Sequence, residues 1–180
     1  MSDQPPDADK PVEDANTEPQ TYVTVIVNPV LAAWGKFGGR IEVAPLAAHA
    51  LFFELSSLSF DVPEVDRHLS GMEYDFGYHF FPLGHGVDGF YIGPRLIYAH
   101  GESDEVVGSL WGFGADLGYQ LVIIRYIALN AGIGAAHVSA TVEPQPGYVD
   151  QAQALGFDGS LSQSVSFWVP LATLGAGMAF

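Results

Sequence analysis

Bulky apolar residues alternate with small or polar residues along most of this chain, and many of the small ones are glycine. The segment 107–121 shows it clearly: Trp111 and Phe113 fall on one parity, and Gly112 and Asp116 fall on the other. Side chains with a period of two point to opposite faces of a β-strand. The alternation therefore predicts strands with one bulky face and one small or polar face.

Eight segments show this period of two, four strongly and four more weakly. Turn-forming residues separate them at intervals too short for helices. Short turns alternate with longer, more acidic connections, and the last connection, Thr141 to Ser164, is much the longest. We therefore predict an all-β, eight-stranded antiparallel up-and-down β-barrel, with strands near 22–33, 40–46, 50–60, 71–82, 89–99, 107–121, 127–135 and 166–180.

Some residues fit this strand pattern badly. A proline removes a ladder hydrogen bond, so we expect bulges or strand ends at Pro29, Pro45, Pro94 and Pro170. Trp34 has the wrong parity for the bulky face. We expect the first strand to shift register near it.

The first 20 residues differ in composition from the rest. They contain four prolines and six carboxylates, with no large apolar side chain apart from Met1 and Val12. We predict that residues 1–20 form a disordered acidic tail and that residues 21–180 form the barrel. This tail does not resemble a signal peptide, so export would require that the signal has already been removed.

The lumen of an eight-stranded barrel is only wide enough to be filled by side chains, so the glycine-rich face is expected inside. The bulky face then points outward, which is the arrangement of a membrane barrel and the inverse of a soluble one. Aromatic residues packed in a sandwich core are the alternative. We predict two interfacial aromatic girdles, an outer one of Tyr74, Tyr98, Trp111 and Trp168 and an inner one of Phe53, Phe80, Phe90, Tyr119 and Phe180.

The last strand, 166–180, ends in Leu-Gly-Ala-Gly-Met-Ala-Phe, with Phe180 as the final residue. It resembles the C-terminal recognition strand of outer-membrane proteins. With Asn28-Pro29-Val30, Gly93-Pro94-Arg95 and Leu117-Gly118-Tyr119-Gln120, the chain resembles small outer-membrane barrels built like the transmembrane domain of OmpA. The resemblance implies a location in the bacterial outer membrane with both termini in the periplasm. It also implies contact with lipopolysaccharide and insertion by the barrel-assembly machinery.

Charged residues recur on the predicted inward face. Arg95 is expected near mid-depth with Asp75, Asp116, Glu54 and His79 around it, and Arg40 with Glu42 toward the outer rim. Enclosed charges must be paired, because an isolated buried ion costs several kcal/mol. We predict a plug of salt bridges. The alternative is a narrow ion or proton channel.

His137 and Ser139 lie two residues apart, on one face of the seventh predicted strand. A His-x-Ser pair in a barrel wall resembles the lipid A deacylases, which use a serine nucleophile, a histidine base and an acidic residue. Only Glu143 and Asp150 are candidates for the acidic member. A lipid-modifying enzyme is therefore kept as an alternative.

Composition excludes other functions. The net charge is −15 with six Lys and Arg in total, which argues against a nucleic-acid partner. There is no cysteine, and the six histidines show no metal-ligand spacing. A weak Ca²⁺ or Mg²⁺ site remains an alternative at His100, Glu102, Asp104 and Glu105.

These patterns predict a non-enzymatic outer-membrane anchor or adhesion protein with a plugged lumen and no cofactor or resident metal. Its long last connection would be presented outward. A protein partner in the periplasm or outside the cell is left open.

Overall fold

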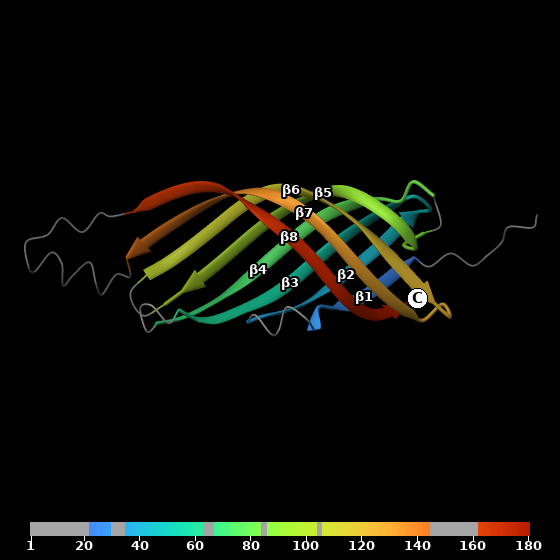
Figure 1. Ribbon diagram of the computed structural model, residues 1–180, viewed down its shortest axis with the longest axis horizontal. Coiled ribbons are helices and arrows are strands. Elements are labelled where there is room, and N and C mark those ends of the chain that lie inside the picture. Colours follow the sequence, from blue (N-terminus) through green and yellow to red (C-terminus); the bar gives the residue numbers. More distant parts are fainter. Residues whose placement is uncertain (1–21, 30–34, 63–66, 84–85, 104–105, 145–161) are drawn as a thin grey trace, which may run out of the picture.

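The computed structural model describes residues 22–29, 35–62, 67–83, 86–103, 106–144 and 162–180. Eight antiparallel strands lie in sequence order, and β1 also pairs with β8 to close the barrel (Figure 1). The predicted ring of eight antiparallel strands is confirmed. No helix in the described residues is long and apolar enough to cross a membrane. The strands are β1 Val23–Val27, β2 Lys36–Leu46, β3 His49–Val62, β4 Arg67–Phe80, β5 Gly89–Glu102, β6 Val106–Ile123, β7 Ile127–Pro144 and β8 Gln163–Ala179.

Some strand bounds differ from those predicted. β1 ends at Val27, and the predicted register shift near Trp34 lies outside the described residues, as does the tail 1–20. β7 continues to Pro144, well past the predicted end at Ala135. After Ala135 the period of two continues with the chemistry of the faces exchanged: the inward residues become apolar and the outward residues polar, from Ala136 and His137 to Val142 and Glu143. The strand continues because its pairing with β6 runs to residue 144.

The prolines behave in different ways. Pro29 follows the end of β1, and the register of β2 shifts between Val43 and Leu46, which contains Pro45. Both outcomes match the prediction. Pro94 and Pro170 instead lie within strands without a register shift. The β4–β5 ladder has a gap beside Pro94. At Pro170, β8 pairs with β7 alone among the described strands, so the proline needs to donate no hydrogen bond on its other side.

The two faces of the barrel have opposite chemistry. Nearly all buried polar residues, from Thr24 on β1 to Thr173 on β8, point into the interior. Large apolar side chains are exposed on the outside, among them Phe76, Leu96 and Phe113, each more than half exposed. The predicted parity therefore separates an inner polar face from an outer apolar face.

Two glycines of the inner face make room for rings. A Cβ on Gly77 would lie 2.4 Å from ring carbons of Phe52, and one on Gly118 would lie 2.4 Å from the hydroxyl oxygen of Tyr91. Real Cβ atoms do not approach so closely. The absence of a side chain at these positions lets two large inward residues fit inside a narrow barrel.

The two ends of the barrel differ. We call the end that carries Tyr22, Phe180 and the turns β2–β3, β4–β5 and β6–β7 the terminal end, and the opposite end the loop end (Figure 1). The amide nitrogen of Tyr22 donates to the carbonyl oxygen of Phe180 at 3.1 Å. The terminal end is filled by an apolar cluster of Ala44, Ala50, Phe81, Val87 and Tyr91.

Gly77→Ala should destabilise the barrel by about 1–3 kcal/mol, because the added methyl overlaps the ring of Phe52. Denaturant-induced unfolding of the refolded protein measures the change. Gly108→Ala is the matched control, since its Cβ would be 3.7 Å from its nearest neighbour, and we expect a change within about 0.5 kcal/mol. Equal losses in both variants would contradict the packing argument.

Candidate functional site

Seven ionisable side chains meet in the barrel interior. Each is at most 5% exposed, and they come from five consecutive strands, β2 to β6. Two guanidinium groups and one imidazole face four carboxylates. These are the residues Arg40, Glu42, Glu54, Asp75, His79, Arg95 and Asp116, which we call the lumen cluster.

Arg40 and Glu54 form one ion pair of the lumen cluster. They are direct cross-strand partners on β2 and β3, so both side chains leave the sheet at the same point. Nε and Nη2 of Arg40 donate to Oε2 of Glu54 at 3.0 and 2.8 Å. Nδ2 of Asn28 donates to the other oxygen, Oε1, at 3.0 Å. Both oxygens of this buried carboxylate therefore have donors.

Arg95 joins two further carboxylates. Its Nη1 donates to Oδ2 of Asp75 at 3.3 Å, and its Nη2 lies 3.0 Å from Oδ2 of Asp116. Asp75 is also the direct cross-strand partner of Glu54. Because two adjacent carboxylates repel each other, the two arginines are needed to hold them side by side.

His79 links the remaining two carboxylates. Its Nδ1 lies 2.6 Å from Oε1 of Glu42, and its Nε2 lies 3.4 Å from Oδ1 of Asp116. His79 thus brings the carboxylates of β2 and β6 together from its position on β4.

Two inward aromatic rings complete the lumen cluster, and the sequence analysis did not single them out. The ring of Phe52 lies 4.5 Å from the guanidinium carbon of Arg40 and 5.1 Å from that of Arg95. The ring of Tyr91 stacks on His79 at a centroid distance of 4.0 Å. The sequence signal that could have identified these two rings is their position in the alternation. Phe52 is two residues from Glu54, and Tyr91 is four residues from Arg95, so each ring points inward with its charged neighbour.

The position of Arg40 and Glu42 differs from the prediction. The sequence placed them toward the outer rim, but both are fully buried and contact Glu54 and His79. Strands of a closed barrel are tilted, so residues at different distances along neighbouring strands reach the same depth. Counting positions along one strand does not reveal that offset.

An amide network lies between the lumen cluster and the terminal end. Nδ2 of Asn130 donates to Oε1 of Gln120 at 3.1 Å, and Nε2 of Gln120 donates to the carbonyl oxygen of Val87 at 2.8 Å. The hydroxyl of Tyr91 donates to Oδ1 of Asn130 at 3.3 Å. Hydrogen-bonded side chains thus continue from the lumen cluster to the apolar cluster at the terminal end.

All nine aromatic residues predicted to lie at membrane interfaces are exposed on the outside of the barrel, at 38–67%. Three of them are register partners: Tyr74 on β4 lies opposite Tyr98 on β5, which lies opposite Trp111 on β6. Phe53 lies opposite Phe76, and Phe90 lies opposite Tyr119, closer to the terminal end.

His137 and Ser139 lie on the outer face, as their parity predicts. The ring of His137 lies between Phe113 and Trp168, at centroid distances of 5.9 and 5.4 Å. The Ser139 hydroxyl shares a hydrogen bond of 2.8 Å with that of Ser166. A serine nucleophile needs its base within hydrogen-bond reach, and here its partner is another serine. Asp150, one candidate for the acidic member, lies outside the described residues.

No family model matches the chain, and no curated protein or solved structure is significantly similar to it. What the structure shows is the architecture alone, a closed ring of eight antiparallel strands. Within the described residues, no group of three or more histidine or acidic side chains is arranged to hold a metal. Two members of the acidic loop considered for a cation, Asp104 and Glu105, lie outside that part of the chain.

Arg95→Met should destabilise the protein by about 3–5 kcal/mol, because it leaves Asp75 and Asp116 buried without their shared cation. Chemical denaturation of the refolded protein measures the loss. Lys36→Met is the matched control: it removes a more exposed cation that pairs with Glu73, and we expect less than about 1 kcal/mol. A similar loss in both variants would show that burial of the lumen cluster does not matter.

Proposed function

We propose that the protein is an integral β-barrel of a bacterial outer membrane, with a non-enzymatic anchoring or adhesion role. The observation that carries the proposal is the inverted distribution of side chains. Charged residues are buried inside the barrel, while large apolar residues surround it on the outside. In water such a surface would be an exposed apolar patch far larger than monomeric soluble proteins carry. In a bilayer it would face lipid.

The outer apolar band has a border that supports this placement. On β5 the outward residues change from Leu96 and Tyr98 to His100 and Glu102 toward the loop end. On β6 the outward residue beyond Trp111 is Ser109. Tyrosine and tryptophan favour the level of lipid head groups. The row Tyr74–Tyr98–Trp111 thus fits the outer girdle. Trp168, the partner of His137, lies two residues closer to the terminal end than Ser166, where this row reaches β8.

Strand length is also adequate for a membrane. β5 has 14 residues. At about 3.3 Å per residue and a tilt of about 45°, such a strand rises roughly 33 Å, more than the roughly 25 Å apolar band of an outer membrane. The loop end of the barrel would then extend beyond the lipid, where its loops meet lipopolysaccharide.

The direction of insertion follows from the two ends. Short turns and both termini of outer-membrane barrels lie in the periplasm. The terminal end, with its three turns and with Tyr22 bonded to Phe180, fits that side. The strand that ends in Phe180 would then be read by the barrel-assembly machinery, and the acidic tail would lie in the periplasm, available to a protein partner.

The interior supports an anchor in preference to a pore or an enzyme. The lumen cluster and the amide network fill the barrel across its middle, and Phe81 and Val87 close the terminal end. On the outer face, Ser139 pairs with Ser166 and His137 packs between two aromatic rings. These contacts favour structural roles for both residues of the candidate enzymatic pair.

Membrane insertion is tested by heat-modifiable migration. After expression with an export signal, we expect the protein in the outer-membrane fraction, resistant to alkaline extraction. An unheated sample should migrate differently from a boiled one on a denaturing gel. A folded protein that stays soluble without detergent would contradict the proposal.

A matched pair of variants sharpens this test. Leu96→Arg places a charge in the middle of the outer band and should cost about 2–4 kcal/mol in lipid, whereas His100→Arg, beyond the border on the same strand and face, should cost about 0–1 kcal/mol. Folding equilibria in lipid vesicles measure both. If both arginine variants lose the same free energy of folding, the outer face around Leu96 is in contact with water and not with lipid.

A plugged lumen predicts no steady conductance in planar bilayers, because the side chains of the lumen cluster are at most 5% exposed and pair with one another across the barrel. Recordings of the refolded protein measure this directly. Steady single-channel conductance that Arg95→Ala abolishes would show that Arg95 lines a pathway, and the plugged barrel would then be wrong.

A further inference from the structure

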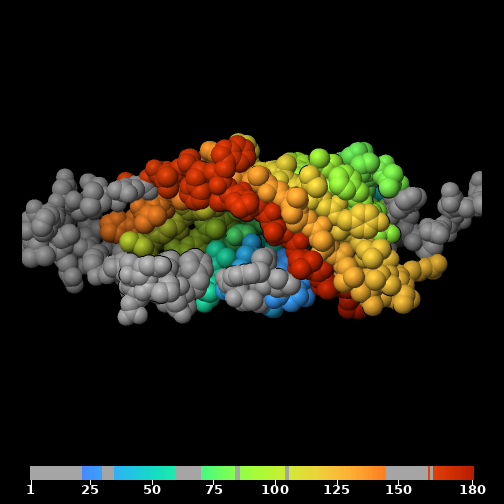
Figure 2. All heavy atoms as spheres, viewed as in Figure 1, coloured from blue at the N-terminus to red at the C-terminus, as the bar shows by residue number. Residues whose placement is uncertain are grey.

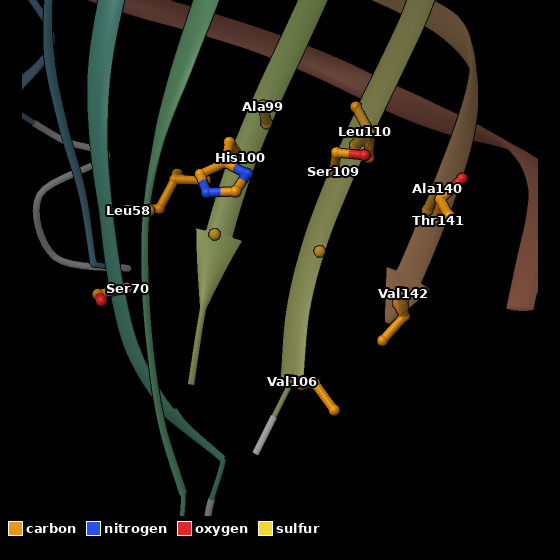
Figure 3. Close-up of a pocket in the computed structure, with 13 residues that line it drawn as sticks. Leu58, Ser70, Ala99, His100, Val106, Ser109, Leu110, Ala140, Thr141 and Val142 are labelled. Atoms are coloured by element: carbon orange, nitrogen blue, oxygen red, sulfur yellow. The ribbon is translucent and has the colours of Figure 1, made fainter. Parts of the chain in front are cut away.

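The barrel interior contains an apolar cavity between the lumen cluster and the loop end. Its volume is about 220 Å³, larger than the roughly 150 Å³ apolar cavities known to bind benzene. Figure 3 shows its labelled lining on several neighbouring strands. The inward-facing lining residues are Leu58, Gly71, Ala99, Gly101, Val106, Gly108, Leu110, Ala140 and Val142.

Small residues create this space, and among the inward-facing lining residues that the structure describes none has a ring. A Cβ on Gly108 would be 3.7 Å from its nearest neighbour, the carbonyl oxygen of Thr141. This differs from Gly77 and Gly118, whose missing side chains are replaced by Phe52 and Tyr91. The inner-face glycines of the barrel middle therefore serve packing, whereas Gly108 leaves open volume.

The cavity adjoins a further apolar part of the lumen. Ile97, Ala136 and Val138 form a buried cluster, against which Leu110, one of the cavity-lining residues, and Val169 and Leu171 of β8 also pack. In Figure 2 the near face of the molecule is hollowed beside β8, and strands with the colours of β5 and β6 form the floor of the hollow. An apolar cavity gives water few hydrogen-bond partners, so it favours apolar ligands.

A second hollow of about 410 Å³ shares Leu58, Gly71 and Gly101 with the cavity but lies against the other side of the barrel wall. Its remaining residues, among them Ser57, Ser70 and Glu102, are exposed and have the outward parity of β3, β4 and β5. The sheet separates the two spaces, so the ligand site is the inner cavity alone.

We propose that this cavity binds one hydrocarbon chain. The chain belongs either to a membrane lipid or to a free amphiphile. Binding of a chain would be a function beyond anchoring, and it depends on the geometry of the lumen. The proposed membrane location only determines the medium in which binding is tested.

The test uses protein with ¹³C-labelled leucine and valine methyl groups, inserted in nanodiscs of deuterated lipid. Protonated 1-octanol should give nuclear Overhauser contacts to the methyls of Leu58, Leu110 and Val142. Affinity should rise about threefold to fourfold per methylene from hexanol to octanol.

Variants that fill the cavity test whether the octanol contacts arise inside it. Gly108→Leu and Ala140→Leu place bulk in the cavity and should abolish them. Ala115→Leu adds the same bulk to the exposed outer face of β6 and should leave them unchanged. If Gly108→Leu fails to fold, Ala140→Leu carries the comparison.

A second sample, with protonated lipid chains and no octanol, identifies the source. Contacts from lipid to the same methyls assign the cavity to a lipid chain, and contacts from octanol alone assign it to a free amphiphile. Absence of contacts in both samples, or contacts that persist in both filled variants, would overturn the proposal. Failure of the protein to enter nanodiscs would contradict the membrane proposal and not the cavity proposal. The octanol titration is then made in aqueous buffer, where the contacts to the same methyls and their loss in the filled variants test the cavity.

Discussion

Closure of the sheet on itself is the constraint on which the rest of the structure depends. β1 has only five residues, yet it pairs with β2 along its length and with β8 at four positions. Once the ring is closed, each strand residue faces either inside or outside. Eight strands enclose a space that side chains must fill, so the inward residues have to satisfy one another.

The interior meets that requirement at the terminal end and in the middle, but not toward the loop end. Apolar residues close the terminal end, and an amide network follows it. The lumen cluster then occupies the middle, where each arginine contacts a carboxylate and the ring of Phe52. Such a cluster specifies one arrangement of the strands, because a shifted register would leave a buried ion without its partner. Toward the loop end the lining becomes apolar and small, and an open cavity results.

The outer face depends on the same alternation with the chemistry reversed. Inward polar or small residues are followed by outward apolar ones, as in Asp75–Phe76, Arg95–Leu96 and Gly112–Phe113. The polarity of the lumen and the apolar band outside are therefore two consequences of one pattern. The polar-to-apolar border at Tyr98 and Trp111 appears only when neighbouring strands are aligned. This is why the anchoring proposal rests on register as well as on composition.

The sequence by itself determined the number of strands, their order and the face of nearly every side chain, because a period of two depends only on local backbone geometry. It also identified all seven members of the lumen cluster. It did not show that β7 extends to Pro144, because beyond Ala135 the outward residues become polar and the pattern of a bulky apolar outer face no longer applies.

Only the tertiary structure decided which inward residues meet. Glu42 reaches His79 across 37 positions of the chain, and Phe52 lies between two arginines from different strands. These contacts depend on strand tilt and on register around the closed ring. Both are properties of the whole barrel and not of any one strand.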